Sequence, residues 1–215
     1  MLKIQSFEFN PFNENTYLLW DEKSKLAAVI DPGCYDDFEK EELKNFIETN
    51  RLIPSLIINT HCHIDHILGV SFIKENYNVK YLIPEKDLPL HRNAVSQGQM
   101  FGFDLEELPE PDEFISEEKL IQIGQDELKP LFTPGHTAGE FCFYSEKNKF
   151  CITGDVLFHQ SIGRTDLWGG DYDTLINSIK NKLLTLPDDT KIYPGHGIDS
   201  TIGTESKQNP FLVNI

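Results

Sequence analysis

Apolar residues in the first part of the chain form short runs that are separated by turn residues. Runs of this length, rich in β-branched and aromatic residues, predict strands over residues 2–9, 16–20 and 26–30. Asp31-Pro32-Gly33 then ends the third run with turn chemistry. Residues 36–51 instead repeat apolar positions at helical spacing, which predicts an amphipathic helix. The side chains expected on its buried face are Phe38, Leu43, Phe46 and Ile47.

Residues 54–59 are apolar and predict a buried strand, which is followed directly by Thr60-His61-Cys62-His63-Ile64-Asp65-His66. A helix is predicted after this motif, over residues 67–76. Further along, we expect a strand over 79–83, helical potential over 85–97, a loop over 99–103 and an exposed acidic connector over 105–112. The motif therefore lies where a strand turns into a helix.

The second half of the chain also places histidine or aspartate directly after apolar strands. Strands are predicted over residues 120–123, 127–132 and 191–193, a hairpin over 141–153, and a helix over 173–186 that begins at Asp171 or Asp173. His136, Asp155 and His196 each follow an apolar strand and each have a glycine beside them. Glycine lets the backbone turn sharply near a crowded centre, and such turns are where a sheet scaffold presents functional side chains.

The spacing within the motif points to metal binding. Side chains at positions i and i+2 of an extended backbone share a face, so His61 and His63 can reach one ion while Cys62 points away. Asp65 and His66 come where the chain turns into the helix, so they can reach a second point nearby. Imidazole nitrogen and carboxylate oxygen are both good zinc ligands.

Composition and charge limit the classes of molecule that the protein is expected to bind. The chain has 215 residues, 39% of them hydrophobic and 25% charged, with a formal net charge of −16. That charge argues against nucleic acid and anionic membranes as partners, but it allows a small-molecule substrate. The chain has no apolar run of the ~18 residues that a membrane span needs, and its N-terminus begins with a strand pattern, so we expect a cytoplasmic protein. The four cysteines lack C-x-x-C spacing and are expected to be free thiols.

The combined pattern resembles the ligand series of the metallo-β-lactamase superfamily. The resemblance rests on residues 60–66, Gly135-His136, Gly154-Asp155 and Gly195-His196-Gly197, which occur in order and at family-like spacing. Within the superfamily, the chain is most similar to the short, single-domain bacterial members of the glyoxalase II (hydroxyacylglutathione hydrolase) branch. The run from Gly154 to Asp166 supports that branch. The resemblance implies one α/β domain over residues 1–215, a four-layer αββα sandwich.

The resemblance also implies a set of metal ligands. His61, His63 and His136 would bind a first divalent ion, while Asp65, His66 and His196 would bind a second. Asp155 would bridge the two ions. Zinc is the favoured metal, with iron and manganese as alternatives.

The implied reaction is hydrolysis of a hydroxyacyl thioester such as S-D-lactoylglutathione by a metal-bridging hydroxide. Asp65 would bind metal, orient the hydroxide and accept its proton. The expected protein is a monomer or a weak homo-oligomer.

Arg164 is the candidate substrate-binding residue, because a lysine that contacts glutathione occupies this place in glyoxalase II. Its guanidinium could hold a substrate carboxylate, or it could pair with Asp166 or Asp171 and shape the loop. Where the family has a tyrosine two residues after that lysine, this chain has Asp166. Only 19 residues follow His196, and Lys207 is the only basic one among them. We therefore expect a site that is more open and less selective for its thiol.

Two other interpretations of the same motifs remain. Persulfide dioxygenases share the fold but use one iron, which His61, His136 and Asp155 would hold here. A non-enzymatic module with structural metals is less consistent with the residues, because structural zinc sites usually close with four ligands and favour cysteine. A β-lactamase is disfavoured by Asp65-His66, which resembles the thioesterase branch.

Overall fold

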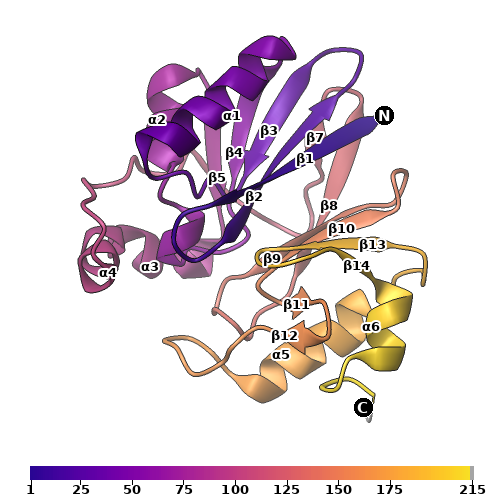
Figure 1. The fold of residues 1–215 in the computed structure, drawn as a ribbon. Coiled ribbons are helices and arrows are strands. Elements are labelled where there is room, and N and C mark those ends of the chain that lie inside the picture. Colours follow the sequence, from indigo (N-terminus) through magenta and orange to yellow (C-terminus); the bar gives the residue numbers. More distant parts are fainter. Residues whose placement is uncertain (214–215) are drawn as a thin grey trace. The chain divides into compact units, whose positions relative to one another are not determined.

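The computed structural model describes residues 1–213, and contacts divide the chain into two compact units. The first contains Met1–Ile115 and Gln122–Glu127, and the second contains Ser116–Ile121 and Leu128–Ile215. Each unit consists of a β-sheet with helices (Figure 1). The α/β class is thereby confirmed, while the single domain expected over residues 1–215 stays a prediction. Within residues 1–213, no helix is long and apolar enough to cross a membrane.

The first unit contains a six-stranded sheet in the order β1-β2-β3-β4-β5-β6. The first three strands are antiparallel neighbours, whereas β3, β4, β5 and β6 run parallel to one another. The strands are β1 (Leu2–Phe9), β2 (Glu14–Asp21), β3 (Leu26–Ile30), β4 (Ile53–Ile58), β5 (Lys80–Ile83) and β6 (Glu113–Phe114). Since the carboxyl ends of parallel strands meet at one edge, the segments that follow β3, β4 and β5 are neighbours there.

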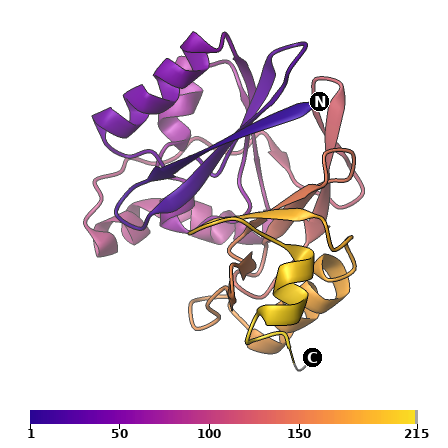
Figure 2. The ribbon, with the colours of Figure 1, turned by 45° about the vertical axis from the view of Figure 1, so that its right-hand side comes forward.

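Four α-helices belong to this unit: α1 (Asp37–Thr49), α2 (Val70–Asn76), α3 (Leu88–Arg92) and α4 (Ala94–Phe101). A 3-10 turn over Glu85–Asp87 directly precedes α3. Helices α1 and α2 lie on the same face of the sheet in both views (Figure 1, Figure 2). Leu43 and Ile47 of α1 join the hydrophobic core that the strands form, together with Val70 and Ile73 of α2.

Helix α1 begins at Asp36, whose side chain accepts a hydrogen bond from the Glu39 N–H in a capping box. Leu43 and Ile47 are buried as predicted, and Phe46 packs against the core. The prediction for Phe38 was wrong, because this side chain is 78% exposed in the first turn. The loop predicted over 99–103 was also wrong in part: α4 extends through Phe101 and ends at Gly102, which adopts the left-handed conformation.

The second sheet has the order β14-β13-β10-β9-β8-β7. Its strands are β7 (Ile121–Ile123), β8 (Asp126–Phe132), β9 (Phe141–Ser145), β10 (Phe150–Gly154), β13 (Lys191–Pro194) and β14 (Ser200–Thr201). A two-stranded hairpin, β11 (Leu157–Phe158) and β12 (Ser161–Ile162), follows β10. Strands β10 and β13 are parallel, so the turns that carry residues 155 and 196 lie at the same edge of this sheet.

The helices of the second unit are α5 (Tyr172–Ser178), which continues into a π-helical turn over Ile179–Leu183, and α6 (Ile202–Gln208). Asp171, one of the two predicted caps, accepts a hydrogen bond from the Thr174 N–H at the start of α5. Leu175, Ile179 and Ile202 pack on the sheet in a second hydrophobic core. All four cysteines are buried free thiols, as predicted.

Candidate metal centre

The histidine motif leaves the carboxyl end of β4 as an extended segment and then forms a 3-10 turn over Ile64–His66. The His61 and His63 rings lie 4.9 Å apart, centroid to centroid, at an angle of 89°. The two side chains therefore lie close to each other, although whether they bind one ion stays a prediction. Cys62 is buried, and burial raises the pKa of its thiol well above the usual value. The thiol is therefore protonated, as expected for a side chain that takes no part in metal binding.

His66 lies against His61, with ring centroids 4.2 Å apart. Ligand atoms of Asp31, His61 and His66 all lie within 4.8 Å of one another, and all three residues are buried. Asp65 is only 13% exposed, and its Oδ2 lies 3.6 Å from His66 Nε2. Three imidazoles and a carboxylate are thus gathered at one edge of the first sheet.

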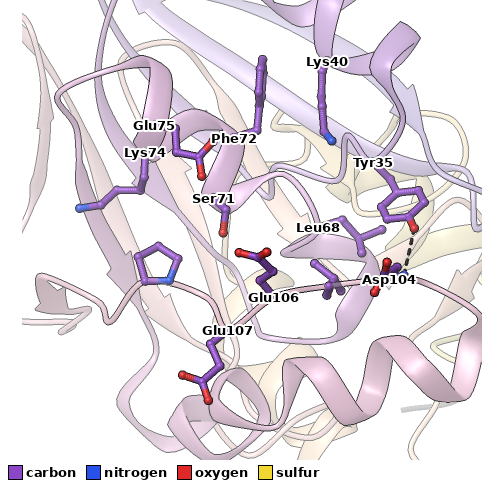
Figure 3. Close-up of a pocket in the computed structure, with 12 residues that line it drawn as sticks. Tyr35, Lys40, Leu68, Ser71, Phe72, Lys74, Glu75, Asp104, Glu106 and Glu107 are labelled. Carbon is purple, nitrogen blue, oxygen red and sulfur yellow. Dashed lines mark hydrogen bonds between the residues drawn. The ribbon is translucent and has the colours of Figure 1, made fainter.

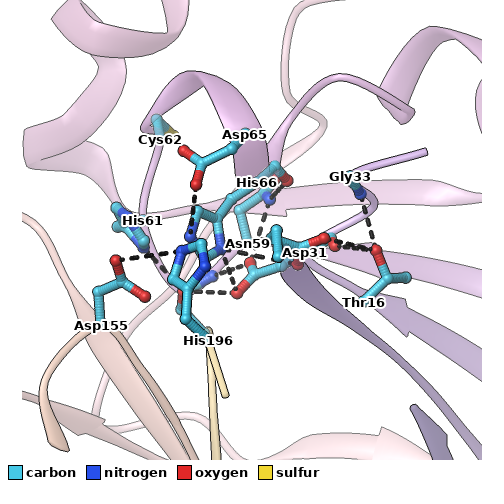
Figure 4. Close-up of polar contacts among 12 residues, drawn as sticks. Thr16, Asp31, Gly33, Asn59, His61, Cys62, Asp65, His66, Asp155 and His196 are labelled. Atoms are coloured by element: carbon cyan, nitrogen blue, oxygen red, sulfur yellow. Dashed lines mark hydrogen bonds and ion pairs between the residues drawn. The ribbon is translucent and has the colours of Figure 1, made fainter. Parts of the chain in front are cut away.

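Asp31 lies beside the His66 imidazole, and its hydrogen bonds orient two histidines (Figure 4). Its Oδ2 accepts the Thr60 hydroxyl hydrogen at 2.7 Å and lies 3.2 Å from His66 Nδ1. Its Oδ1 accepts the backbone N–H of Thr60 at 2.7 Å and the Asn59 amide at 3.2 Å. Because the Thr60 hydroxyl gives its only hydrogen to Asp31, its oxygen must accept from His61 Nδ1, which lies 3.0 Å away. Both imidazoles then carry their hydrogen on Nδ1 and direct a lone pair from Nε2.

Glu14 of β2 adds a second buried acid beside this group. Burial raises the pKa of Glu14 well above its usual value, and the neighbouring Asp31 and Asp65 carboxylates also raise it, although His66 opposes them. Thr16 contacts Glu14 Oε2 at 2.9 Å. A buried concentration of carboxyl groups is costly unless positive charge is close by. A divalent cation bound by the adjacent histidines would supply that charge.

His136, Asp155 and His196 lie close to one another within the second unit. Asp155 Oδ2 is 3.5 Å from His136 Nε2 and 3.6 Å from His196 Nε2. His136 Nδ1 donates its hydrogen to the Arg164 carbonyl oxygen at 2.7 Å, so its Nε2 directs a lone pair toward the carboxylate. A lone pair that faces a carboxylate oxygen is repulsive unless a cation lies between them.

The spacing of these atoms fits shared metal ligands. Nitrogen and oxygen ligands about 2.1 Å from a tetrahedral zinc ion lie about 3.4 Å from each other. The distance between His66 Nε2 and Asp65 Oδ2 is 3.6 Å, and the two distances from Asp155 are 3.5 and 3.6 Å. All three are longer than a hydrogen bond between nitrogen and oxygen. The donor groups of each unit therefore fit a divalent metal.

Two neighbours hold Asp155 and His136 in place. The backbone N–H of Asp155 donates to the buried Glu140 carboxylate at 2.8 Å. Gly163 approaches so closely that a Cβ there would lie 1.8 Å from the Asp155 carbonyl oxygen and 3.2 Å from His136 Cβ. Only glycine allows this approach of the loop to the donor residues.

Arg164 has a structural role that sequence reasoning missed, because its carbonyl oxygen orients His136. Its exposed guanidinium forms a two-point ion pair with Asp166, at 2.7 Å from Nε to Oδ1 and 2.9 Å from Nη2 to Oδ2. This pair lowers the pKa of Asp166 to about 2. The pairing with Asp166 was one of the two predicted alternatives, and the substrate contact of Arg164 stays a prediction.

Sequence reasoning also missed Asp31, Glu14 and Glu140. Asp31 had a usable signal, since it follows an apolar strand directly, as Asp155 does. Glu14 and Glu140 had a weaker one, because each is a lone acid in or beside a strand. Their burial, with both side chains 0% exposed, is a property of the folded chain.

The first unit also contains a cavity of about 510 Å³ between α2 and residues 104–109 (Figure 3). Leu68 and Phe72 provide part of an apolar lining, and Glu75, Glu106 and Glu107 provide carboxylates. Its lining residues come from α2, from the segment 104–109 and from single positions nearby, and none belongs to the histidine motif. We therefore assign the candidate chemistry to the donor residues and not to this cavity.

Comparison with known proteins identifies the fold. A family model described as Metallo-beta-lactamase superfamily matches residues 9–196. The chain is 38% identical over 213 residues to hydroxyacylglutathione hydrolase GloC of Haemophilus influenzae, and the match covers 98% of each protein. The structure of BLEG-1 B3 metallo-beta-lactamase is similar with a TM-score of 0.89 and 34% identity, over 99% of both chains.

The structure of TTHA1623 in a di-iron-bound form is similar with a TM-score of 0.86 and 35% identity, over 97% of this chain and 100% of that one. Together these likenesses extend over nearly all of the sequence. They confirm the predicted metallo-β-lactamase fold.

Proposed function

We propose that this chain, which belongs to the metallo-β-lactamase superfamily, is a metal-dependent hydrolase that cleaves hydroxyacyl thioesters such as S-D-lactoylglutathione. The observation that carries the proposal is the spacing of 3.5–3.6 Å between imidazole Nε2 and carboxylate oxygen atoms in both units. The similarity to GloC, a hydroxyacylglutathione hydrolase, supports the choice of substrate.

The proposed ligands are divided between the two units. His61, His63, Asp65 and His66 come from the first, and His136, Asp155 and His196 come from the second. The proposal requires the two sets to serve the same pair of divalent ions, with zinc favoured and with iron or manganese as alternatives. When bound, such ions supply Lewis-acid activation of the acyl carbonyl and of water.

Within the chain, Asp65 is the proposed catalytic base. Its side chain is 13% exposed, so water can reach it, and Asn10 Nδ2 holds its carbonyl oxygen at 3.0 Å. In this proposal the carboxylate orients the attacking water and accepts its proton. Asp31 and the Arg164 carbonyl accept the Nδ1 hydrogen of their histidine partners, which leaves Nε2 as the atom that would bind a metal ion.

Arg164 is the proposed substrate-binding residue. Its guanidinium is 60% exposed, and it would have to exchange Asp166 for a carboxylate of the substrate. Such an exchange between two exposed partners costs little, because solvent screens surface ion pairs and they contribute little to stability. The net charge of −16 favours a small molecule over nucleic acid as the ligand, and we propose a monomer or weak homo-oligomer.

The test uses purified protein that has been stripped of metal and then reconstituted separately with zinc, iron or manganese. We expect hydrolysis of S-D-lactoylglutathione, loss of that turnover after chelation, and a fall in kcat of about 10²–10⁴ in Asp65→Asn. Asp37→Asn, at an exposed position of α1, is the matched control and should keep full activity. Turnover that survives complete metal removal would refute the proposal.

Two further substrates extend the same assay. Oxygen uptake with a persulfide substrate by protein that holds a single iron would favour the dioxygenase instead. A chromogenic β-lactam tests the activity named for BLEG-1, and we expect thioester turnover to exceed β-lactam turnover.

A further inference from the structure

Asp87 is a buried acid whose position at first suggests a helix cap. It immediately precedes α3, where an aspartate side chain usually accepts a hydrogen bond from the first turn of the helix. Instead, its Oδ2 accepts the backbone N–H of Cys62 at 3.2 Å. The carboxyl group is 0% exposed and reaches across 25 positions of sequence. Burial of a carboxylate is costly. Because the Asp87 side chain makes no cap hydrogen bond to α3, a role as a helix cap does not explain its burial.

The group that Asp87 holds is the peptide between two proposed metal ligands. Cys62 lies between His61 and His63, and its N–H belongs to the backbone that connects them. The direction of both imidazoles depends on the extended conformation of this short segment. A fixed acceptor for the Cys62 N–H therefore limits how far the two rings can move.

Strand order places Asp87 opposite a second carboxylate. Strand β4 leads into the motif and lies between β3 and β5, with which it is parallel. Asp31 follows β3 and accepts the Thr60 N–H, whereas Asp87 follows β5 by four residues and accepts the Cys62 N–H. The backbone on either side of His61 is thus held by carboxylates from the two neighbouring strand ends.

Main-chain hydrogen bonds between β4 and its two neighbouring strands continue as far as Asn59. The Asp31 N–H donates to Ile58 O at 3.0 Å, and the Asn59 N–H donates to Leu82 O at 3.0 Å. Beyond Asn59, side-chain carboxylates accept the N–H groups of Thr60 and Cys62. The segment is therefore fixed although it has left the sheet.

We propose that Asp87 is a positioning residue for the metal centre, which fixes the peptide between His61 and His63 through the Cys62 N–H. The inference rests on the proposed function in one respect only, namely that His61 and His63 bind metal. It predicts that loss of the acceptor, and not loss of the charge, weakens metal binding.

Two variants separate acceptor from charge. Asp87→Ala removes the acceptor, and Asp87→Asn keeps an oxygen that can accept the Cys62 N–H while it removes the charge. We expect Asp87→Ala to bind zinc 10- to 100-fold more weakly in competition with a chromophoric chelator, the usual range for residues that orient ligands. Asp87→Asn should stay within about threefold of the parent protein, because it keeps the hydrogen bond.

Asp36→Ala is the matched control, since Asp36 is a true cap in the same unit. It should lower the melting temperature by about 2–4 °C, the shift expected for the loss of one helix cap at this chain length. It should leave zinc affinity unchanged. Equal zinc affinities in Asp87→Ala and the parent would overturn the inference, and so would an Asp87→Asn variant as weak as Asp87→Ala.

A second readout needs no metal and no substrate. In the metal-free protein, amide hydrogen exchange at Cys62 should be at least about tenfold faster in Asp87→Ala, while exchange at Asn59 stays the same. Unchanged exchange at Cys62 would contradict the inference even if turnover were lost. A parent protein that binds zinc but leaves thioesters intact would instead contradict the proposed function and leave the role of Asp87 standing.

Discussion

Replacement of Asp31 with asparagine changes one atom in a group that controls two proposed ligands. The amide oxygen can replace Oδ1, which accepts two N–H hydrogens from Thr60 and Asn59. The amide NH₂ then replaces Oδ2, which accepts the Thr60 hydroxyl and lies beside His66 Nδ1. A donor at this place repels the His66 hydrogen and turns the Thr60 hydroxyl toward His61. Both histidines are then driven to carry hydrogen on Nε2, where a metal could no longer bind.

The size of the effect follows from the bonds that are lost. Two hydrogen bonds to a charged acceptor contribute about 1.5–3 kcal/mol each, so Asp31→Asn loses about 3–6 kcal/mol in all. Part of that loss falls on the free energy of unfolding, and the remainder on metal binding. Since residues that orient metal ligands usually change affinity 10- to 100-fold, we expect zinc affinity to fall about 100-fold.

The assay combines chelator competition with nitrogen NMR of the metal-free protein, which distinguishes hydrogen on Nδ1 from hydrogen on Nε2. The parent protein should show Nδ1 hydrogens on His61 and His66, and Asp31→Asn should show Nε2 hydrogens on both. Asp21→Asn is the control, because Asp21 is also a buried acid of the first unit. It lies at the end of β2 opposite to Glu14, the residue beside Asp31. Unchanged ring protonation in Asp31→Asn, or zinc affinity equal to that of the parent, would refute the reasoning.

Three further predictions follow from other contacts. Arg164→Ala should raise KM for an anionic thioester several-fold while Asp166→Ala does not, and equal KM changes in both variants would assign Arg164 to the loop alone. Gly135→Ala should lower zinc affinity by displacing His136, because Gly135 has a φ of 136° and a Cβ there would lie 2.3 Å from a backbone atom of α5. If competition titration gave this variant the same zinc affinity as the parent protein, the prediction would be wrong. The pKa of Asp21 falls from 3.8 to about 2, chiefly through its hydrogen bond with the Ser24 hydroxyl, so this group stabilises the fold above pH 3.8 and its contribution disappears as the pH falls toward 2. In urea unfolding, the stability difference between the parent and Asp21→Asn should therefore be constant near neutrality and shrink over that acidic interval, and a difference that grows there would contradict the assignment.

Strong local patterns made much of the first unit predictable. The strands over Leu2–Phe9 and Leu26–Ile30 have the predicted bounds, because turn residues follow each apolar run. Phe38 misled the helix prediction because it lies in the first turn of α1, where its side chain stays in solvent. Hydrophobic periodicity cannot distinguish such an end position from one that faces the core.

Short elements were beyond prediction. Strands β11, β12 and β14 have two residues each, which is too few to show any periodicity. Strands β11 and β12 pair with each other, and β14 pairs with β13 at the edge of the second sheet. Helix α6 also went unpredicted, and its cap, Thr201, is recognisable only once the helix is known.

The candidate ligands could be proposed from the sequence because each follows an apolar strand, and within each unit the sheet topology brings such turns to one edge of that unit's sheet. The supporting residues were not, because Asp31, Asp87 and Glu140 act through contacts between segments far apart in sequence. Their roles depend on strand order, which local pattern does not determine. The contacts at Nδ1 of His61, His66 and His136 could be identified only from the structure.

Metal content per chain is the measurement that tests this account most directly. Protein reconstituted with excess zinc and passed through a desalting column should retain two zinc ions per chain by elemental analysis, and Asp155→Ala should retain fewer. Retention of a single ion, or of none, by the parent protein would contradict a centre built from donors of both units.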